Sequence, residues 1–143
     1  MTLLLLLGLQ AAWAQAGSCE RYRQPMSMRG WLVRRTFAEQ PNYESIAGGD
    51  RAATYYFLSL RRPVCVDAGL DELGPQAAEE GIPEVQLVFS AGAAAFEVLR
   101  PYLGKTVECR GRLQHAVTGH HHSLVLLAGA DCHAVGNGPR SRR

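Results

Sequence analysis

One stretch of the sequence has the pattern of a helix, and strand-like segments lie on both sides of it. Ser90 can cap a helix over residues 93–99, in which Phe96 and Leu99 share one face. Pro101 ends this helix, because proline cannot continue one. Any fold for this chain must therefore place this short helix in the middle of a mainly β sequence.

Three strand-like segments precede the predicted helix. Residues 28–33 alternate in polarity around Gly30, which suggests a bent or bulged strand. Residues 54–60 are β-branched and aromatic, and Pro63 limits how far this strand can lie inside a sheet. Residues 85–89 form the third apolar strand.

Two strands follow the helix. Residues 106–113 alternate with a period of two, which predicts a strand with one buried and one solvated face. The last strand extends from Leu124 to about Cys132. The residues predicted to face inward in the first of these strands are Val107, Cys109, Gly111 and Leu113, and those predicted to face water are Glu108, Arg110 and Arg112.

The predicted order β-β-β-α-β-β is that of the OB-fold, a five-stranded, partly open barrel with its helix between strands three and four. Similar phrases at residues 29–32 and 110–113 place Gly30 and Gly111 where a small barrel must bend its strands. We therefore expect a mainly β, OB-like five-stranded barrel. A generic α+β sheet with two unrelated glycines is the alternative.

The ends of the chain differ in composition from its middle. Residues 3–9 are apolar and Ala14-Gln15-Ala16 follows, which is typical of a secretory signal peptide cleaved after Ala16. A lipoprotein acylated at Cys19 is the alternative, and the apolar run is shorter than the roughly 20 residues that span a bilayer. The sequence thus predicts a periplasmic or secreted protein without a membrane span, composed of a signal peptide (1–16), one OB-like domain (17–135) and a disordered basic tail (136–143).

The cysteines favour disulfides over a metal site. An even number of them in an exported chain predicts two bridges, and no closely spaced C-x-x-C pair is present. Cys19 lies just before the first strand and Cys65 at the end of the antiparallel second strand, which predicts the bridge Cys19–Cys65. The remaining two cysteines are Cys109 and Cys132.

The second predicted bridge follows from the hairpin formed by the last two strands. Cys109 lies eleven residues before His120, and Cys132 lies eleven residues after His121. A turn centred between these histidines would place the two cysteines opposite each other, within disulfide range. The predicted pair is Cys109–Cys132, although a bulge in the fourth strand would shift the pairing by one residue.

Several phrases along the chain together resemble one protein family. They are residues 36–37, 41–46, 49–50, 60–66, 103–107, 111–113 and 118–122. In this order they resemble the bacterial secreted proteins grouped as domain-of-unknown-function family 4431, over roughly residues 28–133. The resemblance implies an exported single-domain protein and no established activity.

Three consecutive histidines mark the candidate site. In an OB-fold, the loops between strands one and two and between strands four and five flank the binding face. In this chain these loops are residues 37–50 and 118–123. We expect them to bring together a ligand-binding set of Tyr43, Glu44, Asp50, His120, His121 and His122.

Metal binding is one hypothesis for the histidines. His120 and His122 share a face if the backbone is extended, and Glu44 or Asp50 would complete a set of nitrogen and oxygen ligands suited to zinc or copper. The simpler interpretation is that the histidines are exposed turn residues, with one of them stacking or hydrogen bonding under the first loop. No G-x-S-x-G or H-E-x-x-H motif is present, so we expect no catalytic residues and no enzyme.

Charge narrows the classes of partner. The formal net charge of +2 is too small to favour nucleic acid as a partner. The acidic segment 67–84 is expected to be a solvated connection with a short helix, and a partner-docking element is the alternative. The predicted function is an exported, non-enzymatic binding module of the bacterial envelope, for an unknown protein or small ligand. The alternatives are zinc or copper binding through the histidines, and an inhibitor or immunity-type protein that docks on an exported enzyme.

Overall fold

The computed structural model describes residues 18–136. The predicted signal peptide and all but the first residue of the predicted tail lie outside the described residues. The structure confirms a mainly β chain with five long strands and one short helix. The long strands are β1 (Pro25–Ala38), β2 (Ala52–Val66), β5 (Glu79–Phe89), β6 (Thr106–His115) and β7 (Val125–Ala134), and the helix is α1 (Ala93–Leu99).

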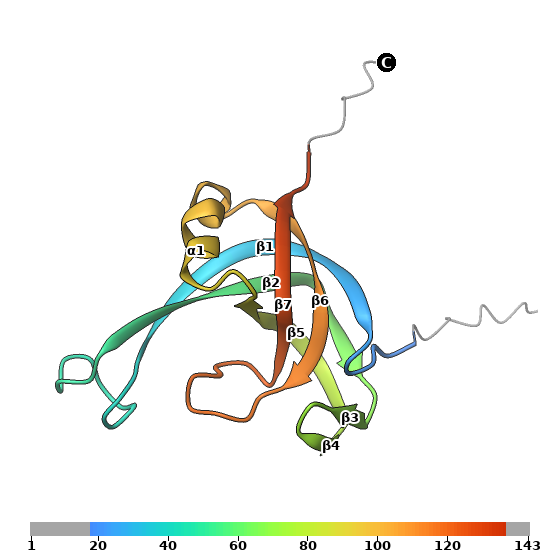
Figure 1. Ribbon diagram of the computed structural model, residues 1–143, viewed down its shortest axis with the longest axis horizontal. Coiled ribbons are helices and arrows are strands. Elements are labelled where there is room, and N and C mark those ends of the chain that lie inside the picture. The colour runs from blue at the N-terminus through green and yellow to red at the C-terminus, as the bar shows by residue number, and fades with distance from the viewer. Residues whose placement is uncertain (1–17, 137–143) are drawn as a thin grey trace, which may run out of the picture.

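The five long strands form one sheet that closes into a ring (Figure 1). β1 pairs with β2, β2 with β5, β5 with β7, β7 with β6, and β6 returns to β1. Every pair is antiparallel except β5 with β7, which is parallel. A parallel neighbour requires a crossover rather than a tight turn, and α1 with the 3₁₀ turn η1 (Arg100–Tyr102) begins that crossover.

Apolar side chains from all five long strands fill the inside of the ring. Burial alternates along β6 as the period of two predicts, with Val107 and Cys109 inside and Arg110 and Arg112 outside. Burying each large apolar side chain contributes roughly 1.5–3 kcal/mol. Core residues from the five strands include Leu32, Leu58, Val85, Val107, Leu113 and Leu127.

Two glycines are required where strands approach closely. A Cβ atom at Gly30 would lie 2.3 Å from the carbonyl oxygen of Ser59, and one at Gly111 would lie 2.7 Å from that of Ala128. No side chain fits at either position, because real Cβ atoms do not approach backbone oxygens so closely. The glycines therefore allow β1 and β6 to pack tightly against their neighbours in the ring.

Both disulfides join the cysteines that the sequence pairs, Cys19 with Cys65 and Cys109 with Cys132. Cys109 and Cys132 are direct partners in the β6–β7 register. A register shift follows, because Arg110 opposes Asp131 whereas Arg112 opposes Ala128, so the extra residue lies in β7. The two disulfides suggest an oxidising compartment. Within the described part of the chain, no helix is long and apolar enough to cross a membrane.

The acidic connection after β2 differs from the prediction. It contains no helix and forms a two-stranded hairpin, β3 (Gly69–Asp71) and β4 (Gly74–Gln76). Asp71 Oδ1 accepts hydrogen bonds from the Leu73 amide at 2.8 Å and the Gln76 side chain at 3.1 Å, which fixes a turn instead of a helix. β5 then begins at Glu79, earlier than the apolar run alone predicted.

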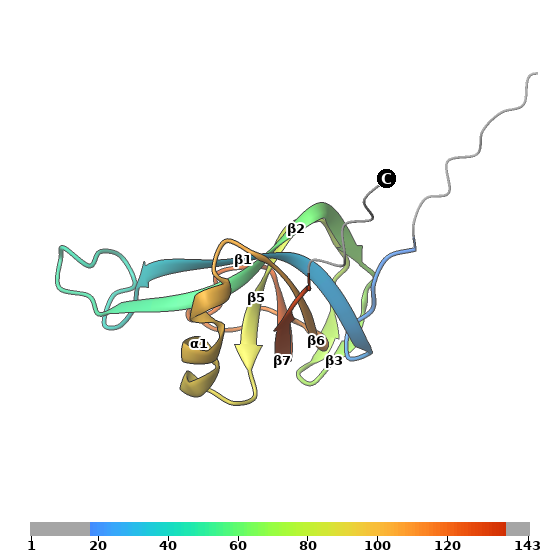
Figure 2. The same ribbon diagram turned by 90° about the horizontal axis from the view of Figure 1, so that it is seen from above.

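Helix α1 has the predicted bounds but a different N-cap. Gly92 occupies the cap and makes no side-chain hydrogen bond, so Ser90 does not cap the helix. The helix is held to the sheet through Phe96, whose carbonyl oxygen accepts from the Tyr56 hydroxyl at 3.1 Å and whose ring packs edge-on against Phe89. Figure 2 shows α1 beside the end of β5.

The β1–β2 hairpin extends beyond the ring, and its tip lies at the left of both views (Figures 1 and 2). Its connecting loop covers residues 39–51. The β6–β7 connection, residues 116–124, is called the His loop from here on, since it carries the three histidines. Side-chain contacts between these two loops form the candidate site.

Candidate functional site

A buried carboxylate lies where the two loops meet. Glu39 follows the last residue of β1, and its side chain is 0% exposed. The Tyr55 hydroxyl donates to its Oε1 atom at 2.7 Å, and His122 Nε2 lies 3.3 Å from the same oxygen. His120 Nδ1 contacts Oε2. One hydroxyl and two imidazoles thus surround a single acid.

These contacts fix the ionisation of both Glu39 and Tyr55. Burial opposes ionisation of Glu39, but hydrogen bonds from Tyr55, His122 and His120 outweigh it and hold the pKa of Glu39 below its ordinary value. Burial, together with the hydrogen bond to the Glu39 anion, raises the pKa of Tyr55 well above its usual range. Near neutral pH the pair is therefore a carboxylate and a protonated phenol.

His122 is packed rather than free. Its ring stacks on Phe37 with centroids 3.7 Å apart and planes within 1° of parallel, and Tyr55 lies at 5.1 Å on a tilted plane. Its side chain is only 15% exposed. This histidine therefore anchors the His loop to the β1–β2 hairpin and is not an exposed turn residue.

Gln86 holds the backbone of the His loop. Its side-chain nitrogen donates to the His120 carbonyl at 2.9 Å, and its side-chain oxygen accepts from the His122 amide at 2.7 Å. The Ser123 hydroxyl accepts a hydrogen bond from the backbone N–H of Gln86 at 3.0 Å and donates one to the Val125 carbonyl at 2.6 Å. A buried amide in β5 thus determines the path of the loop.

Tyr43 contacts the His loop as the sequence suggested. Its ring meets His120 edge-on at 5.8 Å, and a Cβ atom at Gly119 would lie 3.1 Å from Tyr43 Cε1. Glycine at this position therefore lets the aromatic ring cover the loop. The His120 side chain remains 43% exposed, so one edge of this imidazole faces solvent.

The two acids expected beside the histidines lie elsewhere. Asp50 accepts from the amides of Asn42, Glu44 and Ser45 and from the Asn42 side chain, at 2.8–3.1 Å. The backbone hydrogen bonds from Ser45, Glu44 and Asn42 lower the pKa of Asp50. Asp50 therefore organises its own loop, and the Glu44 side chain is exposed.

Glu39 takes the position that the sequence assigned to Glu44 or Asp50. Phe37 and Glu39 lie two residues apart and both face the His loop. The buried positions earlier in β1 are Met28, Gly30 and Leu32, so the same alternation places Glu39 on the opposite, solvated face, and the sequence offered no signal for its burial. In addition, β1 extends to Ala38, whereas the predicted strand ended at residue 33.

His121 closes the His loop on itself. Its Nδ1 atom accepts from the Val117 amide at 2.9 Å and lies 3.3 Å from the Thr118 amide. Burial and the nearby rings of His120 and His122 lower the pKa of His121. The ring is therefore neutral and carries its hydrogen on Nε2.

The metal hypothesis is not supported by this arrangement. His120 and His122 both face Glu39, while the oxygens of Asp50 are occupied by its own loop. Among residues 18–136, no group of three or more His, Cys, Asp or Glu side chains is arranged to hold a metal ion.

An apolar hollow of about 310 Å³ lies beside the cluster. Pairing between β2 and β5 ends at Phe57 and Gln86, so the last residues of β5 continue without β2 as a partner. The space between β5, α1 and the His loop is lined mainly by apolar side chains. These include Val88, Phe89, Ala93 and Phe96, and the polar lining comes from Tyr55, Gln86, His120 and His121. We call this space the hollow.

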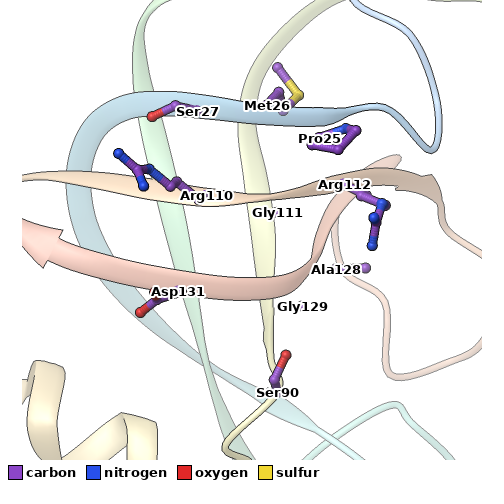
Figure 3. Close-up of a pocket in the computed structure, with 10 residues that line it drawn as sticks. All are labelled: Pro25, Met26, Ser27, Ser90, Arg110, Gly111, Arg112, Ala128, Gly129 and Asp131. Carbon is purple, nitrogen blue, oxygen red and sulfur yellow. The ribbon is translucent and has the colours of Figure 1, made fainter.

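A larger depression of about 560 Å³ lies outside the ring on β1, β6 and β7. Arg110 and Arg112 line it, but their side chains point away from each other, and Asp131 adds an opposite charge (Figure 3). Its polar groups do not converge on one point. The hollow beside Glu39 is the better candidate site.

Comparison with known proteins gives one family match. Residues 84–128 match the family described as "Domain of unknown function (DUF4431)". The match covers less than half of the chain, and it includes the second half of β5, α1, β6 and the His loop but neither Glu39 nor Tyr55. No curated protein and no solved structure matches the chain.

Proposed function

We propose that this protein is an exported, non-enzymatic binding module with an OB-like barrel, acting in the bacterial envelope. The strand order β1-β2-β5-β7-β6 and the position of α1 between the third and fourth long strands support the OB-like assignment. The two disulfides support a location outside the reducing cytoplasm. Its ligand is a small organic molecule that enters the hollow.

The observation that carries this proposal is the composition of the hollow. Small-molecule sites are concave, start at about 300 Å³, and combine an apolar lining with a few fixed polar groups. The hollow has this size, an apolar wall from β5 and α1, and the polar side chains of Tyr55 and His120. Both are held in place by contacts with Glu39, so these polar groups are preorganised.

A neutral fluorescent probe tests the proposal. N-phenyl-1-naphthylamine brightens when it leaves water, and we expect saturable binding at one site of the intact protein. Ala93→Leu should abolish this binding, because Ala93 lines the hollow and a larger side chain would fill it.

Ala94→Leu is the matched control, since Ala94 is an exposed neighbour in the same helix and does not line the hollow. It should bind the probe as the wild type does. Absence of saturable binding to the wild type, or equal binding by the two leucine variants, would refute the proposed function.

A further inference from the structure

The hydroxyl of Tyr55 can only accept a hydrogen bond from a ligand. A phenol has one hydrogen, and Tyr55 donates it to Glu39 Oε1 at 2.7 Å. Its raised pKa keeps that hydrogen in place. His120 Nδ1 lies 3.4 Å from the same oxygen, so the acceptor capacity that His120 does not use is the part of this group that remains for a ligand.

His120 presents a second acceptor. Its Nδ1 atom contacts Oε2 of the ionised Glu39, which can only accept, and on this ground we assign the ring hydrogen to Nδ1. In the neutral ring the other nitrogen, Nε2, then has a free lone pair. This side chain lines the hollow and is 43% exposed, so a ligand can reach it.

The charge behind these two acceptors is negative. Within residues 18–136, the ion pairs of the Glu39 carboxylate are with His120 and His122, and it forms none with an arginine or lysine. Away from bulk water, its field is less weakened by the solvent. The positive charge of Arg51 lowers the pKa of Tyr55, but Arg51 is exposed, and water and salt screen its charge.

The opposite wall completes the description of the hollow. Val88, Phe89 and Phe96 offer apolar surface, and His121 contributes one hydrogen-bond donor through Nε2. The combination favours a ligand with an apolar body and a donor group at one end. A protonated amine satisfies both the acceptors and the negative charge.

We propose that the hollow selects small apolar amines, with the ammonium group at the polar end formed by Tyr55 and His120 and the apolar body against β5 and α1. This inference rests on the proposed function and names the class of ligand. It also assigns the preference for a cationic over an anionic ligand to Glu39 and His120. The apolar wall supplies affinity for any ligand of suitable shape.

Three ligands of similar shape test the inference by NMR titration of the intact protein. They are 2-phenylethylamine, which is a cation, 2-phenylethanol, which is neutral, and 3-phenylpropionate, which is an anion. We expect the amine to bind at least about tenfold more tightly than the carboxylate, a difference of about 1.4 kcal/mol. The alcohol should lie between them.

Two variants locate the source of this preference. His120→Phe keeps a ring against Tyr43 but removes both nitrogens, and it should bring the amine and the carboxylate to nearly equal affinity. Glu44→Gln removes an exposed acid from the same hairpin tip and should leave the preference intact.

The outcomes separate this inference from the function on which it rests. If the three ligands bind equally, or the carboxylate binds best, while the probe still binds, the inference is wrong and the proposed function stands. A preference that persists in His120→Phe would overturn the assignment to this residue. If the wild type binds neither the probe nor any of the three ligands, both proposals fail.

Discussion

Removing the carboxylate of Glu39 should strongly destabilise the protein. Glu39→Ala leaves the Tyr55 hydroxyl and the His122 Nε2–H without their acceptor, and both side chains are largely shielded from water. A buried donor that loses its partner costs about 1–3 kcal/mol. With two such donors and a small cavity, we expect the free energy of unfolding to fall by about 3–4 kcal/mol.

A double-mutant cycle followed by urea denaturation and circular dichroism measures this effect. Tyr55→Phe alone should cost about 1–2 kcal/mol, and the double variant should cost less than the sum by about 1 kcal/mol, because the two groups share one hydrogen bond. Glu44→Ala, in the adjacent loop, should change stability by less than about 0.5 kcal/mol. A cost below about 1 kcal/mol for Glu39→Ala, or strictly additive effects, would refute the central role of this carboxylate.

Two further predictions concern the frame around the site. Gly111→Ala should destabilise the protein by about 1–3 kcal/mol, because its Cβ would clash with the Ala128 carbonyl. Gly69→Ala is the control, since the atoms nearest to its Cβ would be 3.9 Å away, and it should change the free energy of unfolding by less than about 0.5 kcal/mol in the same denaturation assay. His115 Nε2 lies 2.8 Å from Glu79 Oε1, and this hydrogen bond raises the pKa of His115. The contribution of His115 to the free energy of unfolding should therefore be complete below the pKa of the unfolded state, and it should be lost as pH rises through the pKa of the folded state. The stability difference between wild type and His115→Gln should therefore shrink from pH 5 to pH 9, and a constant difference would contradict this.

The architecture was largely predictable from local patterns. The period of two in residues 106–113, the short helix at 93–99 and the cysteine spacing each reflect a rule that acts along the chain, and the strand pairs and disulfides follow from them. The β3–β4 hairpin was missed because its turn depends on Asp71. The Asp71 carboxylate also accepts from the distant His115 amide, a contact that no local pattern indicates.

The candidate site was predictable in its position but not in its chemistry. The two loops meet, and Tyr43 reaches the histidines, as the order of strands suggested. The acid was misassigned because Glu39 lies past the expected end of β1. Gln86 gave no signal at all, since a single polar residue in an apolar strand does not show that its amide will bind a loop 34 residues away.

The side-chain hydrogen bonds of Gln86 go to the backbone of His120 and His122 and not to their imidazole rings. The route of the loop and the chemistry that it displays are therefore encoded by different residues. Exchanging His120 for another side chain should alter what the hollow recognises without redirecting the chain around it. One frame can in this way present different recognition groups, and the same frame is suited to engineered binding specificities.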